Sequence, residues 1–200
     1  TPLLPDGRLF IMSLAIAFLL TGFHFLFRLQ DIGRVAQELA LVVTAFLYVP
    51  FLFAHLVMLR LLPQGSNWLL LIMLIVMTND SAAYYIGSAF GKHRLYEAVS
   101  PKKSIEGALG GLGGSLAGTL LAKFTFFPQL GYADILITAL VVGLIGQVGD
   151  LFESLLKRSF GVKDSGNIFP GHGGVLDRMD SIIFAAPVTY YYAVYLRSEE

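Results

Sequence analysis

The sequence predicts an all-α, polytopic integral membrane protein with about six transmembrane helices. Of its 200 residues, 56% are hydrophobic and only 14% are charged, and the mean hydropathy is +0.69. This is more apolar surface than a soluble domain of this length can bury in one core. Long apolar stretches also recur along the chain, and the basic residues concentrate in alternate connecting segments.

Six stretches are long and apolar enough to cross a bilayer, which takes about 20 residues in a helix. They cover residues 8–28, 35–62, 67–90, 104–127, 131–157 and 176–197. The first is too long for the core of a signal peptide and lacks a small-residue cleavage pattern after it, so we expect a span there. Because the chain starts with Thr1 rather than Met, we also expect that further sequence precedes it.

The basic residues predict the orientation of these spans. If the spans alternate in direction, the segments after the first, third and fifth share one face of the membrane. Most of the 14 basic residues lie in those three segments: Arg28, Arg34, Lys92, Arg94, Lys102, Lys103, Lys157, Arg158, Lys163 and Arg178. Cytoplasmic segments carry such an excess, so we place all three in the cytoplasm and both ends of this chain outside.

Composition excludes several kinds of chemistry. The chain has no cysteine, which removes disulfides, thiolate catalysis and thiolate metal sites. Its formal net charge is zero, so bulk charge gives no argument for a nucleic-acid partner. The stretch GALGGLGGSLAG lacks the spacing of a nucleotide-binding loop. Gly110, Gly114 and Gly118 instead recur every four residues, which predicts a helix face against which another helix packs closely.

Carboxylates in apolar surroundings are the candidate reactive groups. Asp80 lies in the third stretch and Asp150 in the fifth. A charge at such depth costs roughly 2.5–3.5 kcal/mol on insertion scales, so it marks a polar cavity or a bound cation unless another helix satisfies it. For Asp80 that alternative is a polar contact, with Asn79 taking part. Glu153 and Lys157 are explained by a surface ion pair at i and i+4, which leaves Asp150 unexplained.

Two further carboxylates begin the last span. Asp177 and Asp180 are three residues apart, so they point the same way on a helix. Like charges held together favour a cation between them, and ligand sets made only of oxygen suit Mg²⁺ rather than zinc. Capping of the helix N-terminus is the alternative, and it explains one of the two.

Basic and glycine-rich segments surround these acids: GKHRLYEAVSPKKSIEG at 91–107 and KRSFGVKDSGNIFPGHGG at 157–174. Glycines expose backbone N–H groups to an anion, and Lys and Arg donate to phosphate. A basic segment alone more often signals topology or contacts anionic lipids. Bases, glycines and carboxylates together on one face indicate phosphoryl chemistry with a metal.

The segment SLLKRSFGVKDSGNIFPGHGGVLDRMD at 154–180 resembles the signature of the phosphatidate cytidylyltransferases, the CDP-diacylglycerol synthases. NDSAAYYIGSAFGKHRL followed by SPKKSIEGALGG is similar to a second block of that family, so the resemblance covers about residues 70–190. It implies a catalytic membrane domain at 67–200 after N-terminal spans at 1–66. It also implies transfer of a cytidylyl group from CTP to phosphatidic acid, with Mg²⁺ as cofactor, at the cytoplasmic face of a bacterial inner membrane.

The resemblance also implies roles for individual residues. Asp150 and Asp177 resemble metal ligands, Asp180 a further ligand or neighbour, and Asp80 an acid near the cation. The candidate contacts to the triphosphate and to phosphatidate are Lys102, Lys103, Lys157, Arg158, Lys163 and Arg178. The remaining candidates are Asp164, which would hold Lys163 or read the nucleotide, and His172, Gly173 and Gly174, which would contact phosphate or order the loop. A second cation and a homodimer are left open.

Three other functions remain as alternatives. A CTP-dependent lipid kinase would use the same nucleotide but transfer its γ-phosphoryl group. A transporter would also place acids such as Asp80 and Asp150 within the membrane, although inverted repeats are not visible in the sequence. A CDP-alcohol phosphotransferase is disfavoured because the acidic motif of that family is absent.

Overall fold

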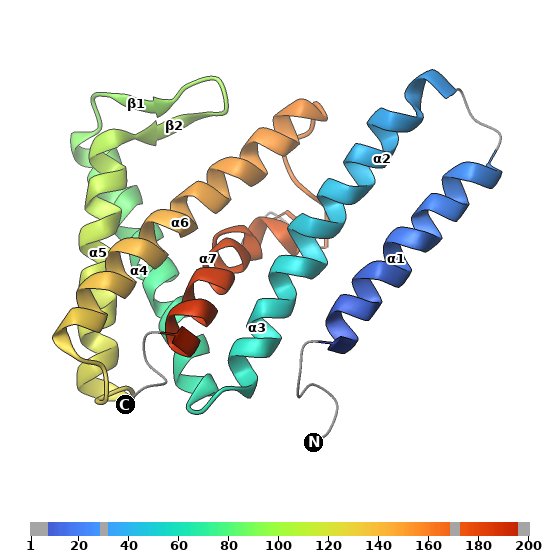
Figure 1. Cartoon of the computed structure of the whole chain (residues 1–200). Helices are drawn as coiled ribbons and strands as arrows, with labels where there is room; N and C mark the ends of the chain where they lie inside the picture. The colour runs from blue at the N-terminus through green and yellow to red at the C-terminus, as the bar shows by residue number, and fades with distance from the viewer. Residues whose placement is uncertain (1–7, 29–31, 169–172, 196–200) are drawn as a thin grey trace. The chain divides into compact units, whose positions relative to one another are not determined.

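The computed structural model describes residues 8–28, 32–168 and 173–195, and it is mostly helical (Figure 1). Its internal contacts divide the chain into two compact units, Thr1–Phe51 and Leu52–Glu200. The expected functional division after residue 66 stays a prediction.

The first unit contains α1 (Arg8–Phe27), α2 (Ile32–Phe46) and a π-helical turn, η1 (Leu47–Phe51). None of the described residues of α2 is buried, and many large apolar side chains of α1 are exposed. Helices that are apolar on their outer surface suit lipid rather than water. The π turn contains Pro50, which has no N–H to donate and so disturbs the regular hydrogen-bond ladder.

The described residues of the second unit form five helices and a short hairpin. These elements are α3 (Leu52–Leu61), α4 (Gly65–Phe90), β1 (Arg94–Tyr96), β2 (Ser100–Ser104), α5 (Ile105–Thr125), α6 (Tyr132–Ser159) and α7 (Leu176–Tyr195). The strands are antiparallel, with Arg94 opposite Ser104 and Tyr96 opposite Ser100. The all-α expectation is therefore right for the helices but missed this hairpin, because the segment lacks the alternation of apolar and polar residues that signals a strand.

Three described helical stretches are long and apolar enough to cross a membrane: Ile32–Leu61, Gly65–Phe90 and Tyr132–Ser159. This finding supports a membrane protein. The count of six spans and the cytoplasmic position of the basic segments stay predictions.

The contact between α4 and α5 is the most extensive in the second unit, and glycines make it possible. A Cβ atom built on Gly110 or Gly114 would lie 2.7 Å from the Cβ of Ile86 or 2.6 Å from the Cβ of Ala82, and one on Gly118 would lie 3.2 Å from the Cβ of Thr78. The first two separations are too short for real side chains, and the third would require Thr78 to move by a few tenths of an ångström. The predicted packing face of Gly110, Gly114 and Gly118 is confirmed.

A buried polar network joins α4 to α5 and α6. The Nδ2 atom of Asn79 donates to Ser115 Oγ at 2.7 Å, and Gln147 Nε2 donates to Asn79 Oδ1 at 3.0 Å and to the carbonyl of Ala108 at 2.9 Å. Asn79 is only 2% exposed, so these partners offset the cost of burying its amide. The network fixes the rotation of α4 about its axis and therefore the direction in which the next residue, Asp80, leaves the helix.

Candidate functional site

Three carboxylates from three helices of the second unit influence one another electrostatically. Asp80 belongs to α4, Asp150 to α6 and Asp180 to the first turns of α7. Asp80 and Asp150 are near enough to repel each other, and Asp180 experiences the charges of both. The sequence predicted each acid separately, and the fold gathers them.

A glycine allows α7 to approach α6 at this point. A Cβ built on Gly149 would lie 2.7 Å from the carbonyl oxygen of Asp180 and 2.6 Å from Phe184 Cβ. The residue before Asp150 must therefore lack a side chain if the two helices are to bring Asp150 and Asp180 together. Small residues at helix contacts serve this purpose in membranes.

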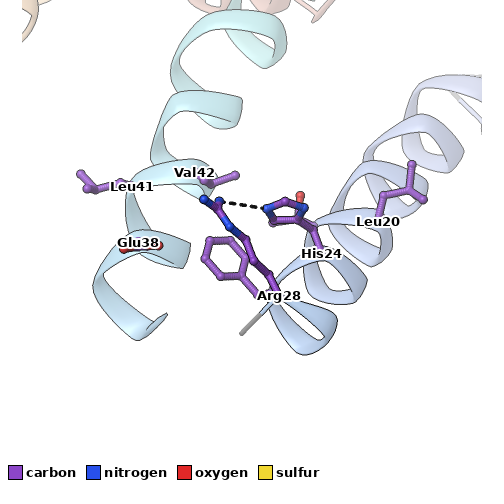
Figure 2. Close-up of a pocket in the computed structure, with 8 residues that line it drawn as sticks. Leu20, His24, Arg28, Glu38, Leu41 and Val42 are labelled. Carbon is purple, nitrogen blue, oxygen red and sulfur yellow. Dashed lines mark hydrogen bonds between the residues drawn. The ribbon is translucent and has the colours of Figure 1, made fainter. Parts of the chain in front are cut away.

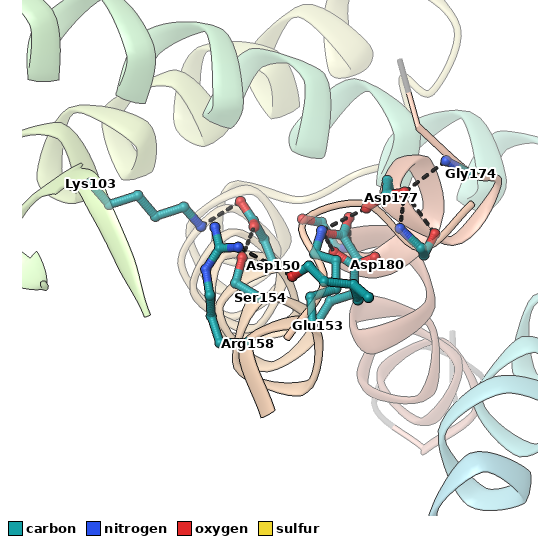
Figure 3. Close-up of polar contacts among 12 residues, drawn as sticks. Lys103, Asp150, Glu153, Ser154, Arg158, Gly174, Asp177 and Asp180 are labelled. Atoms are coloured by element: carbon teal, nitrogen blue, oxygen red, sulfur yellow. Dashed lines mark hydrogen bonds and ion pairs between the residues drawn. The ribbon is translucent and has the colours of Figure 1, made fainter. Parts of the chain in front are cut away.

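Lys103 joins the acidic group from the hairpin. Its ammonium forms an ion pair with Asp150 Oδ2, and Ser154 Oγ lies 3.5 Å from Asp150 Oδ1. Figure 3 shows the Lys103 side chain extending from the hairpin toward Asp150. The Lys103 ammonium is therefore the cation that lies beside Asp150. The predicted ion pair of Glu153 with Lys157 does not explain why Asp150 is present.

The base of the hairpin is tied to the start of α5. Glu106 accepts hydrogen bonds from the backbone N–H groups of Lys92 at 3.1 Å and His93 at 3.3 Å, and its carboxylate lies 2.6 Å from His93 Nδ1. Ser104 caps the helix by accepting from the Gly107 N–H at 3.1 Å. These contacts hold β2 in a fixed position, so Lys103 reaches Asp150 from a stable support.

A second group of charges links α6 to the beginning of α7. The Lys157 ammonium forms ion pairs with Glu153 Oε2 on its own helix and with Asp177 Oδ1 at 2.6 Å. Glu153 is only 1% exposed. The pairing expected from the i, i+4 spacing is present, but its description as a surface pair is wrong. The i, i+4 spacing in the sequence shows that Glu153 and Lys157 can meet on one helix. It does not show that α7 packs over Glu153 and buries it.

Asp177 organises the segment that precedes α7. Its Oδ2 atom accepts from Ser165 N at 2.8 Å, Ser165 Oγ at 2.7 Å and Gly174 N at 2.7 Å. Gly173 has φ of +80°, and a Cβ there would lie 2.6 Å from Asp177 Oδ2. The expected donation of a glycine N–H to an anion is thus realised at Gly174, with a carboxylate of the same chain as the anion.

Several predicted residues are exposed, and Asp80 is one of them. Lys102, Arg158, Lys163, Asp164 and Arg178 are exposed, and Arg158 Nη1 donates to the carbonyl of Val162 at 3.2 Å. His172 lies outside the described residues. The polar residues that sequence reasoning passed over are Gln147 and Ser115, together with Glu153 as a buried group. A Gln within an apolar helix was the available signal for the first of these.

The acids fit a hard cation in chemistry but are not arranged around one. Among the described residues, no three acidic or histidine side chains are gathered tightly enough to hold a metal ion as they stand. Lysine ammonium groups instead pair with Asp150 and Asp177. Oxygen ligands of this kind are those that Mg²⁺ prefers, and a cation at Asp150 would have to displace Lys103.

A cavity of about 540 Å³ lies within the first unit (Figure 2). It shares no lining residue with the group of acids and lysines described above. Its wall is mostly apolar, and His24 Nε2 lies 3.4 Å from Arg28 Nη1 there. The lining residues are Leu20, Thr21, His24, Phe25, Arg28, Glu38, Leu41 and Val42. None of them is a predicted site residue.

The fold and the site indicate a helical membrane protein in which lysines pair with acids of α6 and α7. The chain belongs to the cytidylyltransferase family, whose model matches residues 3–196. It is 39% identical over 158 residues to a phosphatidate cytidylyltransferase of Bacillus subtilis (strain 168), covering 78% of this chain and 58% of that protein. The family expected from the signature is confirmed.

Other bacterial relatives with the same name give a similar result. Identity is 44% to the protein of Staphylococcus haemolyticus (strain JCSC1435) and 46% to that of Staphylococcus aureus (strain COL). Each match covers 125 residues, which is 62% of this chain and 48% of the relative. The chain therefore spans about half the length of the curated relatives it matches.

Proposed function

We propose that the protein transfers a cytidylyl group from CTP to phosphatidic acid, forming CDP-diacylglycerol and pyrophosphate. Membership of the cytidylyltransferase family and relatives named for this reaction support the proposal. The observation that carries it is the ion pair of Lys103 with Asp150, beside Asp180. A charged nucleotide from water and a lipid phosphate from the bilayer both need a polar site of this kind.

The reaction needs little covalent chemistry from the protein. A phosphate oxygen of phosphatidic acid attacks the α-phosphorus of CTP. The bond from that phosphorus to the oxygen bridging to the β-phosphorus breaks, and pyrophosphate leaves with the electron pair. The protein has to orient two polyanions and offset the charge that develops between them.

We propose Asp150, Asp177 and Asp180 as the ligands of Mg²⁺, with Asp80 nearby. Gly149 lets α7 approach α6 at Asp180, next to Asp150, and two carboxylates brought toward each other in this way favour a dication between them. Asp177 lies one turn before Asp180, although its oxygens accept hydrogen bonds from Lys157, Ser165 and Gly174 in the structure. A bound Mg²⁺ would supply charge stabilisation to the phosphates.

The basic residues would bind the substrate phosphates. Lys103 lies beside the acids, so its ammonium can turn to a phosphate when a cation replaces it at Asp150. The exposed side chains of the two basic segments would meet the incoming polyanions: Lys102, Arg158, Lys163 and Arg178. The excess of bases in these segments supports a cytoplasmic active site in a bacterial inner membrane.

A dual-label assay tests the proposal. The chain is reconstituted in vesicles containing phosphatidic acid and is given Mg²⁺ with CTP labelled either in cytosine or at the γ-phosphate. We expect cytosine label in the lipid and one pyrophosphate released for each lipid formed. A lipid kinase would place the γ-label in the lipid, and a transporter would place neither label there, so either outcome would overturn the proposal.

A further inference from the structure

Glu153 is the most deeply buried acid near the site. Its side chain is almost inaccessible, and the ion pair to Lys157 engages only Oε2. The Oε1 atom has no hydrogen-bond partner among the described residues. Burying a carboxylate is unfavourable unless a cation lies beside it. An apolar residue at this position would avoid that cost, so filling the space between the helices does not explain why the residue is an acid.

The contacts of Lys157 supply one. Its ammonium lies between Glu153 of α6 and Asp177 of α7, so it links the two helices. The other carboxylate oxygen of Asp177, Oδ2, accepts hydrogen bonds from the N–H and hydroxyl of Ser165 and from the N–H of Gly174. A continuous series of contacts therefore runs from the interior of α6 to the backbone at Ser165 and at Gly174.

We propose that Glu153 is a positioning residue, which holds the Lys157 ammonium against Asp177 and thereby fixes the Asp177 carboxylate where it binds the backbone of Ser165 and Gly174. The expected effect of Glu153 on catalysis rests on the proposed cytidylyltransfer. The structural part of this role can be measured without any substrate.

Restraint of Lys157 explains why an acid is needed. The lysine side chain has four rotatable bonds, and Asp177 alone would hold it by a single contact. A second carboxylate on the same helix confines the ammonium to the interface between α6 and α7. Glu153 also lies near enough for its charge to act on Asp180, so its loss would change the field at the acidic site as well as the position of Lys157.

A double-mutant cycle tests the link to Lys157. We expect Glu153→Gln to lower the melting temperature of the purified chain, because Lys157 loses one partner. Lys157→Met should lower it by about 5 °C or more, because two acids are left without their cation. Glu153→Gln added to Lys157→Met should then raise the melting temperature, since it removes one of those acids. A further fall in the double variant would overturn the proposal.

Hydrogen exchange distinguishes positioning from packing. We expect the amides of Ser165 and Gly174 to exchange about tenfold faster in Glu153→Gln than in the parent, because Asp177 is no longer held in place. Lys157→Met should cause the same change, and the double variant should be no faster. Glu97→Gln, an exposed acid of the hairpin segment, is the matched control and should leave both amides unchanged. If the amides of Ser165 and Gly174 exchange at the parental rate in Glu153→Gln, Glu153 serves packing alone and the proposal is wrong.

Activity adds a third readout. We expect Glu153→Gln to reduce kcat/KM for CTP about tenfold, the effect of one misplaced charged contact. Glu153→Asp, which keeps the charge on a shorter side chain, should lie between Gln and the parent. If the parent itself makes no CDP-diacylglycerol, the proposed function fails, while melting and exchange still decide the role of Glu153.

Discussion

Lys103 of the β-hairpin and Asp150 of α6 form an ion pair that joins two segments remote in sequence. Asp150 lies in an apolar helix, where an unpaired carboxylate would be costly. The ammonium offsets that cost and lies beside Asp150, where we propose that Mg²⁺ binds. Binding of a cation at Asp150 would therefore break an ion pair that stabilises the folded protein. Two of the predictions below test this pair.

Neutralising Asp150 should abolish most turnover. Asp150→Asn keeps the size of the side chain but removes the charge proposed to hold a cation against the triphosphate, so we expect a loss of at least about 10²–10³ in kcat. The assay is formation of CDP-diacylglycerol by purified, folded protein. Asp134→Asn is a matched control because Asp134 is a buried acid at the other end of α6, bound by Tyr192, and it should keep turnover per folded molecule. More than about a tenth of parental activity in Asp150→Asn would remove Asp150 from the metal site.

Removal of divalent cations should stop the reaction. The proposed ligands are carboxylates and the chain has no cysteine, so a hard cation such as Mg²⁺ is expected to be required. Turnover is followed in excess chelator and again after Mg²⁺ is restored in excess. Undiminished turnover in chelator would contradict the metal assignment.

Lys103 and Lys102 should differ although they are neighbours. Lys103→Met removes the charge paired with Asp150, and we expect kcat/KM for CTP to fall about tenfold or more. Lys102 is exposed, where charge contacts are weaker, so Lys102→Met should cause a smaller loss. Equal losses in the two variants would argue against a special role for the Lys103–Asp150 pair.

The two basic segments should lie on one face of the membrane. Single cysteines at Lys102 and at Lys163 are introduced separately into the cysteine-free chain in vesicles and treated with an impermeant thiol reagent. We expect both to react from the same side, because both segments carry the charge excess of cytoplasmic loops. Reaction from opposite sides would refute the six-span topology.

Two glycines of α5 should respond oppositely to alanine. A Cβ at Gly111 would lie 2.6 Å from Asn79 Oδ1 and 2.7 Å from Gln147 Nε2, whereas one at Gly113 meets nothing within 4 Å. We expect Gly111→Ala to destabilise the protein by about 1–3 kcal/mol through overpacking. Gly113→Ala should stabilise it by roughly 0.5–1 kcal/mol, because alanine loses less backbone entropy in a helix. Melting temperatures of the two variants check the difference, and equal shifts would show that the network does not constrain α5.

The helices, the glycine face of α5 and the family could all be predicted from the sequence. Each depends on local spacing: apolar length defines a helix that can span, a glycine every four residues defines one face, and the signature at 154–180 is a contiguous string. Such features need no knowledge of which segments meet. The individual acids were identified for the same reason, since a charge in an apolar run is visible in the run itself.

The pairing of the charges could not be predicted from the sequence, because it depends on how the helices pack. Gly149 lets α7 approach α6, and this contact buries Glu153 and places Lys157 between it and Asp177. The hairpin likewise brings Lys103 to Asp150 rather than leaving it in an unstructured basic segment. The pairing of charges depends on distances through space, and these are set by helix packing that periodicity along one helix does not specify.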